Sequence, residues 1–138
     1  GLNKILKQLE TRSRPKINKG VRAALVVIWG NIISETPVDI GTARASWRIT
    51  KGTPSKVKGR RTREEDVRAK TSRLDIFKDI KWYMTSNLPY ITTLEYGGYP
   101  VPSKSGKTIN GYSELAPKGM VRVNMIKWPR ALKAAFNI

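Results

Sequence analysis

The first apolar positions of the chain follow the period of an α-helix. Four of them are spaced i, i+3, i+4 and i+7, which places them on one helical face. These four are Leu2, Ile5, Leu6 and Leu9. We expect Pro15 to end or interrupt this helix, and the same period over residues 17–34 predicts a second helix that carries the core face. Thr36 stands before Pro37 and disfavours helical torsions, so the second helix should stop there.

Alternation of apolar and polar residues predicts two strands further along the chain. The first covers residues 43–50, after a turn at 37–41, and the second lies within residues 76–87. The segment between them, residues 51–75, is strongly basic and nearly free of apolar side chains. We therefore predict an antiparallel hairpin whose tip is a long, extended basic loop.

The remaining third of the chain predicts short elements. Residues 91–95 suit a short helix ended by Gly97, and residues 99–117 read as an irregular loop rich in Pro, Gly, Ser and Lys. Residues 121–136 fit a strand at their start and a helix over their whole length, and the longer pattern favours the helix. Pro129 should kink this helix or mark the start of a new one.

Together these elements predict a single domain, residues 1–138, of the α+β class. A long N-terminal helix packs on a small antiparallel sheet with an extended basic hairpin loop and a C-terminal helix, while residues 1–16 form an N-terminal arm or short helix. One tryptophan falls in each main element, which favours an aromatic core seam over a ligand cage. These core aromatics are Trp29, Trp47, Trp82 and Trp128.

The net charge of the chain narrows its possible functions most. The 138 residues include 27 Lys and Arg against 10 Asp and Glu, with no His and no Cys, for a formal charge of +17. The commonest general base, the thiol nucleophile and the usual zinc ligands are therefore missing, and polyanions or acidic proteins are the favoured partners. Without cysteine, without an apolar run near the roughly 20 residues of a membrane span, and without a signal peptide in residues 1–11, we expect a soluble intracellular protein.

The basic loop has three interpretations. Its cations only keep an exposed loop hydrated, or they face the phosphates of a nucleic acid, or they dock against an acidic protein ring. No aromatic residue interrupts the run, so stacking on single strands is not predicted. The cations concerned are Lys51, Lys56, Lys58, Arg60, Arg61, Arg63, Arg68 and Lys70.

Catalytic, metal and cofactor sites are not expected. Glu64, Glu65 and Asp66 form the one acidic cluster, and balancing nearby arginines is favoured over metal binding or nuclease chemistry. The Gly-Lys-Thr at residues 106–108 lacks the earlier glycine of a phosphate-binding loop, so we interpret it as a polar surface loop.

Three segments, in this order, resemble the tail-completion or neck proteins of tailed bacteriophages, the group of the lambda minor tail protein Z. With the preceding helix they span most of residues 17–136. The chain has Ile40 and Thr42 where members of that family often carry Thr and Arg. The three motifs are Thr36–Arg48, then Asn87–Ile91 with Leu94–Gly98, then Ala116–Arg122.

The resemblance implies a structural virion protein without catalysis. It implies a small α+β subunit that forms a homo-oligomeric ring, expected to hold six copies, at the head–tail junction, with DNA in the lumen and neck and tail-terminator proteins as neighbours. It implies neither a membrane nor a small-molecule substrate. The turn motifs that carry the resemblance include Pro37, Asp39, Gly41, Pro89, Tyr90, Glu95, Gly97, Pro117 and Gly119.

A six-fold ring of this chain would gather about a hundred positive charges, which DNA or acidic neighbouring rings must offset. Charge alone also fits a second hypothesis, a free-standing protein that binds nucleic acid without sequence specificity.

Overall fold

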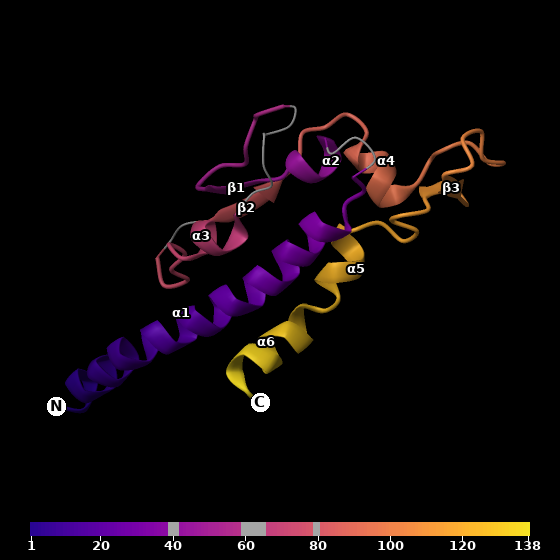
Figure 1. Cartoon of the computed structure of the whole chain (residues 1–138). Helices are drawn as coiled ribbons and strands as arrows, with labels where there is room; N and C mark the ends of the chain where they lie inside the picture. The colour runs from indigo at the N-terminus through magenta and orange to yellow at the C-terminus, as the bar shows by residue number, and fades with distance from the viewer. Residues whose placement is uncertain (39–41, 59–65, 79–80) are drawn as a thin grey trace.

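The computed structural model describes residues 1–38, 42–58, 66–78 and 81–138. Its longest element is helix α1 (Leu2–Glu35), with the small sheet and α3 along one side and the C-terminal helices along the other (Figure 1). The predicted α+β class, the long N-terminal helix and the C-terminal helix are confirmed.

Helix α1 runs unbroken through Pro15, so the predicted end or interruption there is wrong. A proline in a helix interior removes the bond to the carbonyl four residues earlier and costs about 3 kcal/mol. The C-terminal half of α1 is fixed by the burial of Ala24, Ile28 and Ile32, so the helical path is already set where the arm joins it. The helix ends as predicted at Thr36, which has extended torsions (φ −71°, ψ 129°).

Strands β1 (Arg48–Lys51) and β2 (Trp82–Thr85) confirm the predicted antiparallel hairpin, with Arg48 opposite Thr85 and Lys51 opposite Trp82. Both strands are shorter than predicted. Residues 76–78, assigned to the second strand from the sequence, instead form a turn that Asn18 holds by accepting the N–H of Ile76 at 2.9 Å.

A helical turn, α2 (Thr42–Ala45), replaces the first half of the predicted strand at 43–50. Ser46 Oγ donates to the carbonyl of Ala43 at 2.6 Å, and Arg48 Nη1 donates to that of Ala45 at 2.7 Å. These side chains fold back onto the backbone, and Ser46 and Arg48 are buried. The alternation of residue types therefore does not separate buried from exposed positions. The turn residues 39–41 lie outside the described residues.

The basic segment is only partly the unburied loop that its composition predicts. Helix α3 (Val67–Thr71) lies within it, and Val67, Thr71 and Leu74 are buried. Asp66 caps this helix by accepting the N–H of Ala69 at 3.1 Å. The segment is thus anchored at one end by a short helix packed on α1.

Helix α4 (Ile91–Tyr96) ends at Gly97 (φ 81°), as predicted. The following stretch, predicted as irregular, contains a small hairpin of β3 (Thr108–Ile109) and β4 (Tyr112–Ser113). Asn110 and Gly111 both have positive φ (52° and 86°), the geometry that favours Asn-Gly in a two-residue hairpin turn.

The ambiguous C-terminal stretch is helical, in two pieces: α5 (Val121–Met125) and α6 (Trp128–Phe136). Pro129 lies in the first turn of α6, so it marks the start of a new helix. Helix α6 runs back along α1 and brings the ring of Phe136 onto Gly20, where any Cβ would overlap the ring.

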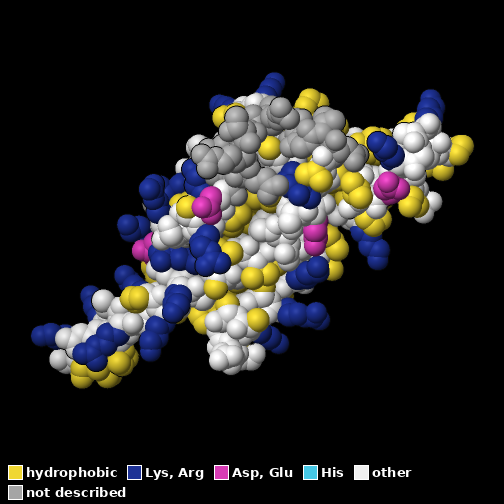
Figure 2. Space-filling view, in the orientation of Figure 1, with side chains coloured by type: hydrophobic (Ala, Val, Ile, Leu, Met, Phe, Trp, Pro, Cys, Tyr) yellow, Lys and Arg dark blue, Asp and Glu magenta, His cyan; other side chains and the backbone are white. Residues whose placement is uncertain are grey.

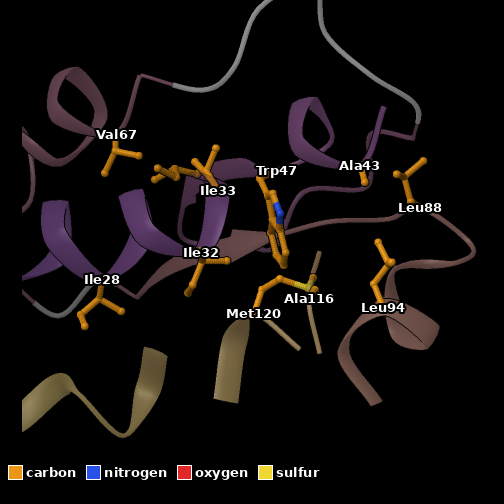
Figure 3. Close-up of a cluster of buried hydrophobic side chains, with 11 residues drawn as sticks. Ile28, Ile32, Ile33, Ala43, Trp47, Val67, Leu88, Leu94, Ala116 and Met120 are labelled. Carbon is orange, nitrogen blue, oxygen red and sulfur yellow. The ribbon is translucent and has the colours of Figure 1, made fainter. Parts of the chain in front are cut away.

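The core lies where the C-terminal half of α1 meets α2, β1 and the motif segments. Figure 3 shows Ile28, Ile32, Trp47 and Met120 converging there. Trp47 is buried in this cluster, and the other three tryptophans are partly buried against it. These three are Trp29, Trp82 and Trp128.

Candidate functional site

The first motif closes on itself around the buried hydroxyl of Thr36. Thr36 Oγ1 donates to the carbonyl of Ile32 at 2.6 Å and accepts the indole N–H of Trp47 at 2.9 Å. Arg44 Nε donates to the Thr36 carbonyl at 3.2 Å. These bonds join the end of α1 to α2 and β1, so the polar side chains of this motif hold the fold together.

The second and third motifs meet at the carboxylate of Glu95, which is buried. It accepts the backbone N–H of Val121 at 2.9 Å and of Arg122 at 3.1 Å, and Arg122 Nη2 donates to the Glu95 carbonyl at 2.6 Å. A Cβ on Gly119 (φ +80°) would lie 2.6 Å from Glu95 Oε1, so only glycine fits there. Glu95 therefore caps the first turn of α5 across 26 residues of chain.

Arg122 is fixed from several sides. Its guanidinium carbon lies 4.4 Å from the centre of the Tyr96 ring. A hydrogen bond with the Tyr112 side chain and the carboxylate of Glu95 raise the pKa of Arg122 above its ordinary value. The positive charge is therefore permanent and is bound into the contact between the two motifs.

A cavity of about 400 Å³ lies beside the first two motifs. Pro37 and Tyr90 contribute to its apolar wall, and Lys104 and Lys107 contribute charge. The other motif prolines, Pro89 and Pro117, are exposed, and Asp39 and Gly41 lie outside the described residues.

Two polar side chains of these motifs, Thr36 and Glu95, are engaged in hydrogen bonds inside the subunit. The Thr36 hydroxyl accepts the indole N–H of Trp47, and the Glu95 carboxylate accepts backbone N–H groups. Within the described ranges, no three His, Cys, Asp or Glu residues gather where they could hold a metal ion. Of the predicted acidic cluster, Asp66 caps α3, and Glu64 and Glu65 fall in a range the structure does not describe.

The predicted basic residues divide into two groups. Lys51, Lys56, Lys58, Arg68 and Lys70 are exposed, whereas Arg60, Arg61 and Arg63 lie outside the described residues. Figure 2 shows lysines and arginines gathered around α3 and along the N-terminal half of α1. The cationic surface is therefore shared between two segments distant in sequence.

A cleft of about 410 Å³ separates α3 from the β1–β2 ribbon. Lys51 from β1, Lys70 from α3 and Arg73 beyond it line the cleft together with the indole of Trp82. The sequence places Lys51 and Lys70 on a basic surface but gives no hint of Trp82, because this residue follows the basic run and joins it only through strand pairing.

The segment after α3 is tied to α1. Asn18 Nδ2 donates to Asp75 Oδ1 at 3.0 Å, and Arg22 Nε donates to the carbonyl of Leu74 at 2.7 Å. The bond from Asn18 and that from the N–H of Phe77 lower the pKa of Asp75 below its ordinary 3.8.

The N-terminal half of α1 carries an apolar stripe made of Leu2, Ile5, Leu6 and Leu9. All four side chains are exposed, and no segment among those described covers them. Figure 2 shows apolar side chains at this tip of the molecule. Exposed aliphatic residues in such a row are typical of a contact surface.

Comparisons with protein-family models, curated proteins and solved structures gave no match to this chain. Among the described helices, none combines the length and apolar character needed to span a membrane.

Proposed function

We propose that this chain is a structural subunit of the neck or tail-completion complex of a tailed bacteriophage. In this proposal the copies, six by the sequence resemblance, form a closed ring around the DNA channel at the head–tail junction. The observation that carries the proposal is the uncovered apolar stripe, Leu2, Ile5, Leu6 and Leu9, on an arm that projects from the body (Figure 1). A free subunit keeps these side chains in water, and a neighbouring subunit would remove them from it.

A second apolar surface lies at the far end of α1. A cleft of about 420 Å³ there is lined by Tyr112, Val123 and Ile126, and Ile126 is exposed. Two different surfaces at opposite ends of an elongated subunit suit a head-to-tail contact, which closes into a ring when the rotation between copies allows it. Lys118 and Arg122 at this cleft would then lie near Glu10 of the next arm.

The buried motif residues support a structural role. The polar groups of Thr36 and Glu95 form hydrogen bonds inside the subunit. These bonds would make the subunit a rigid body for assembly. The charge of +17 on each copy requires polyanionic surroundings, which DNA in the lumen and acidic neck or tail-terminator proteins would supply.

Native mass spectrometry and electron microscopy of the purified chain over a range of concentrations test this function. We expect monomers or weak association in dilute protein and closed rings of one stoichiometry in concentrated protein. A chain that remains monomeric throughout, or that forms only open filaments, contradicts the proposal.

The shared cationic surface of α1 and α3 favours the second candidate, a free-standing, non-specific nucleic-acid-binding protein. Gel shifts at two salt concentrations separate the two functions. Monomers that bind tightly at the lower salt concentration, with an affinity that falls as salt rises, favour the second candidate. Binding that is weak at both salt concentrations favours the ring subunit.

A further inference from the structure

We propose that the cleft between α3 and the β1–β2 ribbon binds an unpaired nucleotide of single-stranded nucleic acid, with its base against Trp82 and its phosphates on Lys51, Lys70 and Arg73. This inference does not depend on ring assembly, because every residue of the cleft belongs to one subunit.

Strand pairing sets the geometry of the cleft. Lys51 and Trp82 are direct partners in the antiparallel register, so their side chains leave the ribbon on the same face with Cβ atoms about 5 Å apart. The buried Ile49 lies two residues before Lys51 and shares this face. An ammonium group therefore stands at the mouth of an apolar wall.

Helix α3 supplies the opposite side. Lys70 and the following Arg73 line the cleft and are exposed. Neither Lys51 nor Arg73 has an ion-pair partner in the described part of the chain. The carboxylates next to them in the described sequence are committed elsewhere, since Asp66 caps α3 and Asp75 accepts from Asn18.

The combination of groups selects the ligand. A guanidinium and two ammonium groups match phosphate oxygens, and an indole offers a surface on which any base can stack. An acidic peptide would satisfy the cations but would leave the Trp82 wall uncovered. A volume of about 410 Å³ suits a nucleotide, because small-molecule sites begin at about 300 Å³. Bases in a duplex are already stacked on their neighbours, so an unpaired base fits and a paired one does not.

The test is binding of a ten-nucleotide oligothymidylate to the full chain at low protein concentration, compared with a ten-base-pair duplex. Lys51→Ala with Arg73→Ala should weaken oligothymidylate binding about tenfold. The matched control, Lys127→Ala with Arg130→Ala, removes the same charges from the exposed C-terminal stretch and should cost about twofold or less. The two variants should bind the duplex equally.

Trp82→Phe gives an independent readout. Oligothymidylate should quench the intrinsic fluorescence of the parent, and this quenching should fall in Trp82→Phe, which keeps an aromatic ring in the partly buried position. Three results would overturn the proposal: equal losses of oligothymidylate binding in the cleft and control variants, a loss of duplex binding in the cleft variant as large as its loss of oligothymidylate binding, or unchanged quenching in Trp82→Phe. Competition by a deca-glutamate peptide as strong as that by oligothymidylate would also overturn it and would indicate a protein-docking cleft. A chain that never forms rings would leave these results unaffected.

Discussion

The two halves of α1 have the same helical period but opposite surroundings. In the C-terminal half, Ile28 and Ile32 are almost fully buried, at 1% and 3% exposure. In the N-terminal half, Leu6 and Leu9 are 53% and 54% exposed. Pro15 lies between the halves and does not break the helix. An apolar helical stripe therefore indicates a face that is suited to burial. Whether the subunit itself buries that face depends on the rest of the fold.

The ion pairs of the arm and of the body also differ in burial. On the arm, Arg14 and Glu10 form an exposed pair one helical turn apart, at 2.9 Å. In the body, the buried carboxylate of Glu95 accepts the backbone N–H groups of residues 120–122 and pairs with the guanidinium of Arg122. The ion pair of the arm is therefore accessible to solvent, whereas the carboxylate of the pair in the body is part of the packed interior.

The largest difference should come from truncating one apolar side chain in each half. Ile28→Ala leaves a cavity in the core and should lower the free energy of unfolding by about 2–5 kcal/mol. Leu6→Ala should change it by less than about 0.5 kcal/mol in the monomer. Urea denaturation at low protein concentration measures both, and comparable losses would show that the arm is covered in the free subunit.

Glycines distinguish close packing from open surface on the same helix. Gly20→Val forces a side chain into the Phe136 ring and should cost about 1–3 kcal/mol. Gly30→Ala has no described atom within 4 Å of its new Cβ, so better helix propensity should stabilise the chain by about 0.5–1 kcal/mol. Thermal unfolding of the two variants should therefore shift in opposite directions. A stabilised Gly20→Val would mean that α6 does not pack there.

Glu95 in the body should contribute more to the free energy of unfolding than Glu10 on the arm. Glu95→Gln replaces a buried acceptor of several N–H groups with an amide and should cost about 1–3 kcal/mol in the free energy of unfolding. Glu10→Gln should cost less than about 0.5 kcal/mol, because exposed pairs one turn apart contribute little. Equal costs in urea denaturation would contradict the capping role of Glu95.

The smallest effect concerns Asp75, near the junction of arm and body. Its pKa is lowered in the folded state, so its contribution to stability is present above pH 3.8 and is lost as the pH falls through the lower folded value. Asp75→Asn should therefore be less stable than the parent at neutral pH, and the difference should shrink in acid. A difference in urea midpoint that is the same at pH 7 and pH 3 would contradict this account.

Periodicity predicted the helices well because apolar residues recur at helical spacing along them, both in the buried half of α1 and in the exposed arm. It failed at residues 43–48, where Ser46 and Arg48 are buried and bond to nearby carbonyls instead of pointing to solvent. The break at Pro15 was also wrong, because one missing hydrogen bond is a smaller cost than the packing that fixes the rest of the helix. The signal for the β3–β4 hairpin, Asn110-Gly111, was present in the sequence but lay in a stretch whose composition favoured a loop.

The candidate sites were less predictable than the fold. The motif order pointed to Glu95 and Gly119 but not to their contact, which depends on α4 packing beside the start of α5. The cleft at Trp82 depends on a strand register that pairs this residue with Lys51. Neither relation leaves a local pattern, because both join residues more than twenty positions apart.

Sedimentation velocity of Leu6→Glu and Gln8→Glu tests the role of the arm most directly. Both substitutions add one negative charge to the exposed arm, but residues two apart on a helix point to different faces, so only Leu6→Glu changes the apolar stripe. We expect the parent and Gln8→Glu to assemble alike with rising concentration, while Leu6→Glu stays monomeric. Assembly of Leu6→Glu to the same size and at the same concentration as the parent would contradict the account.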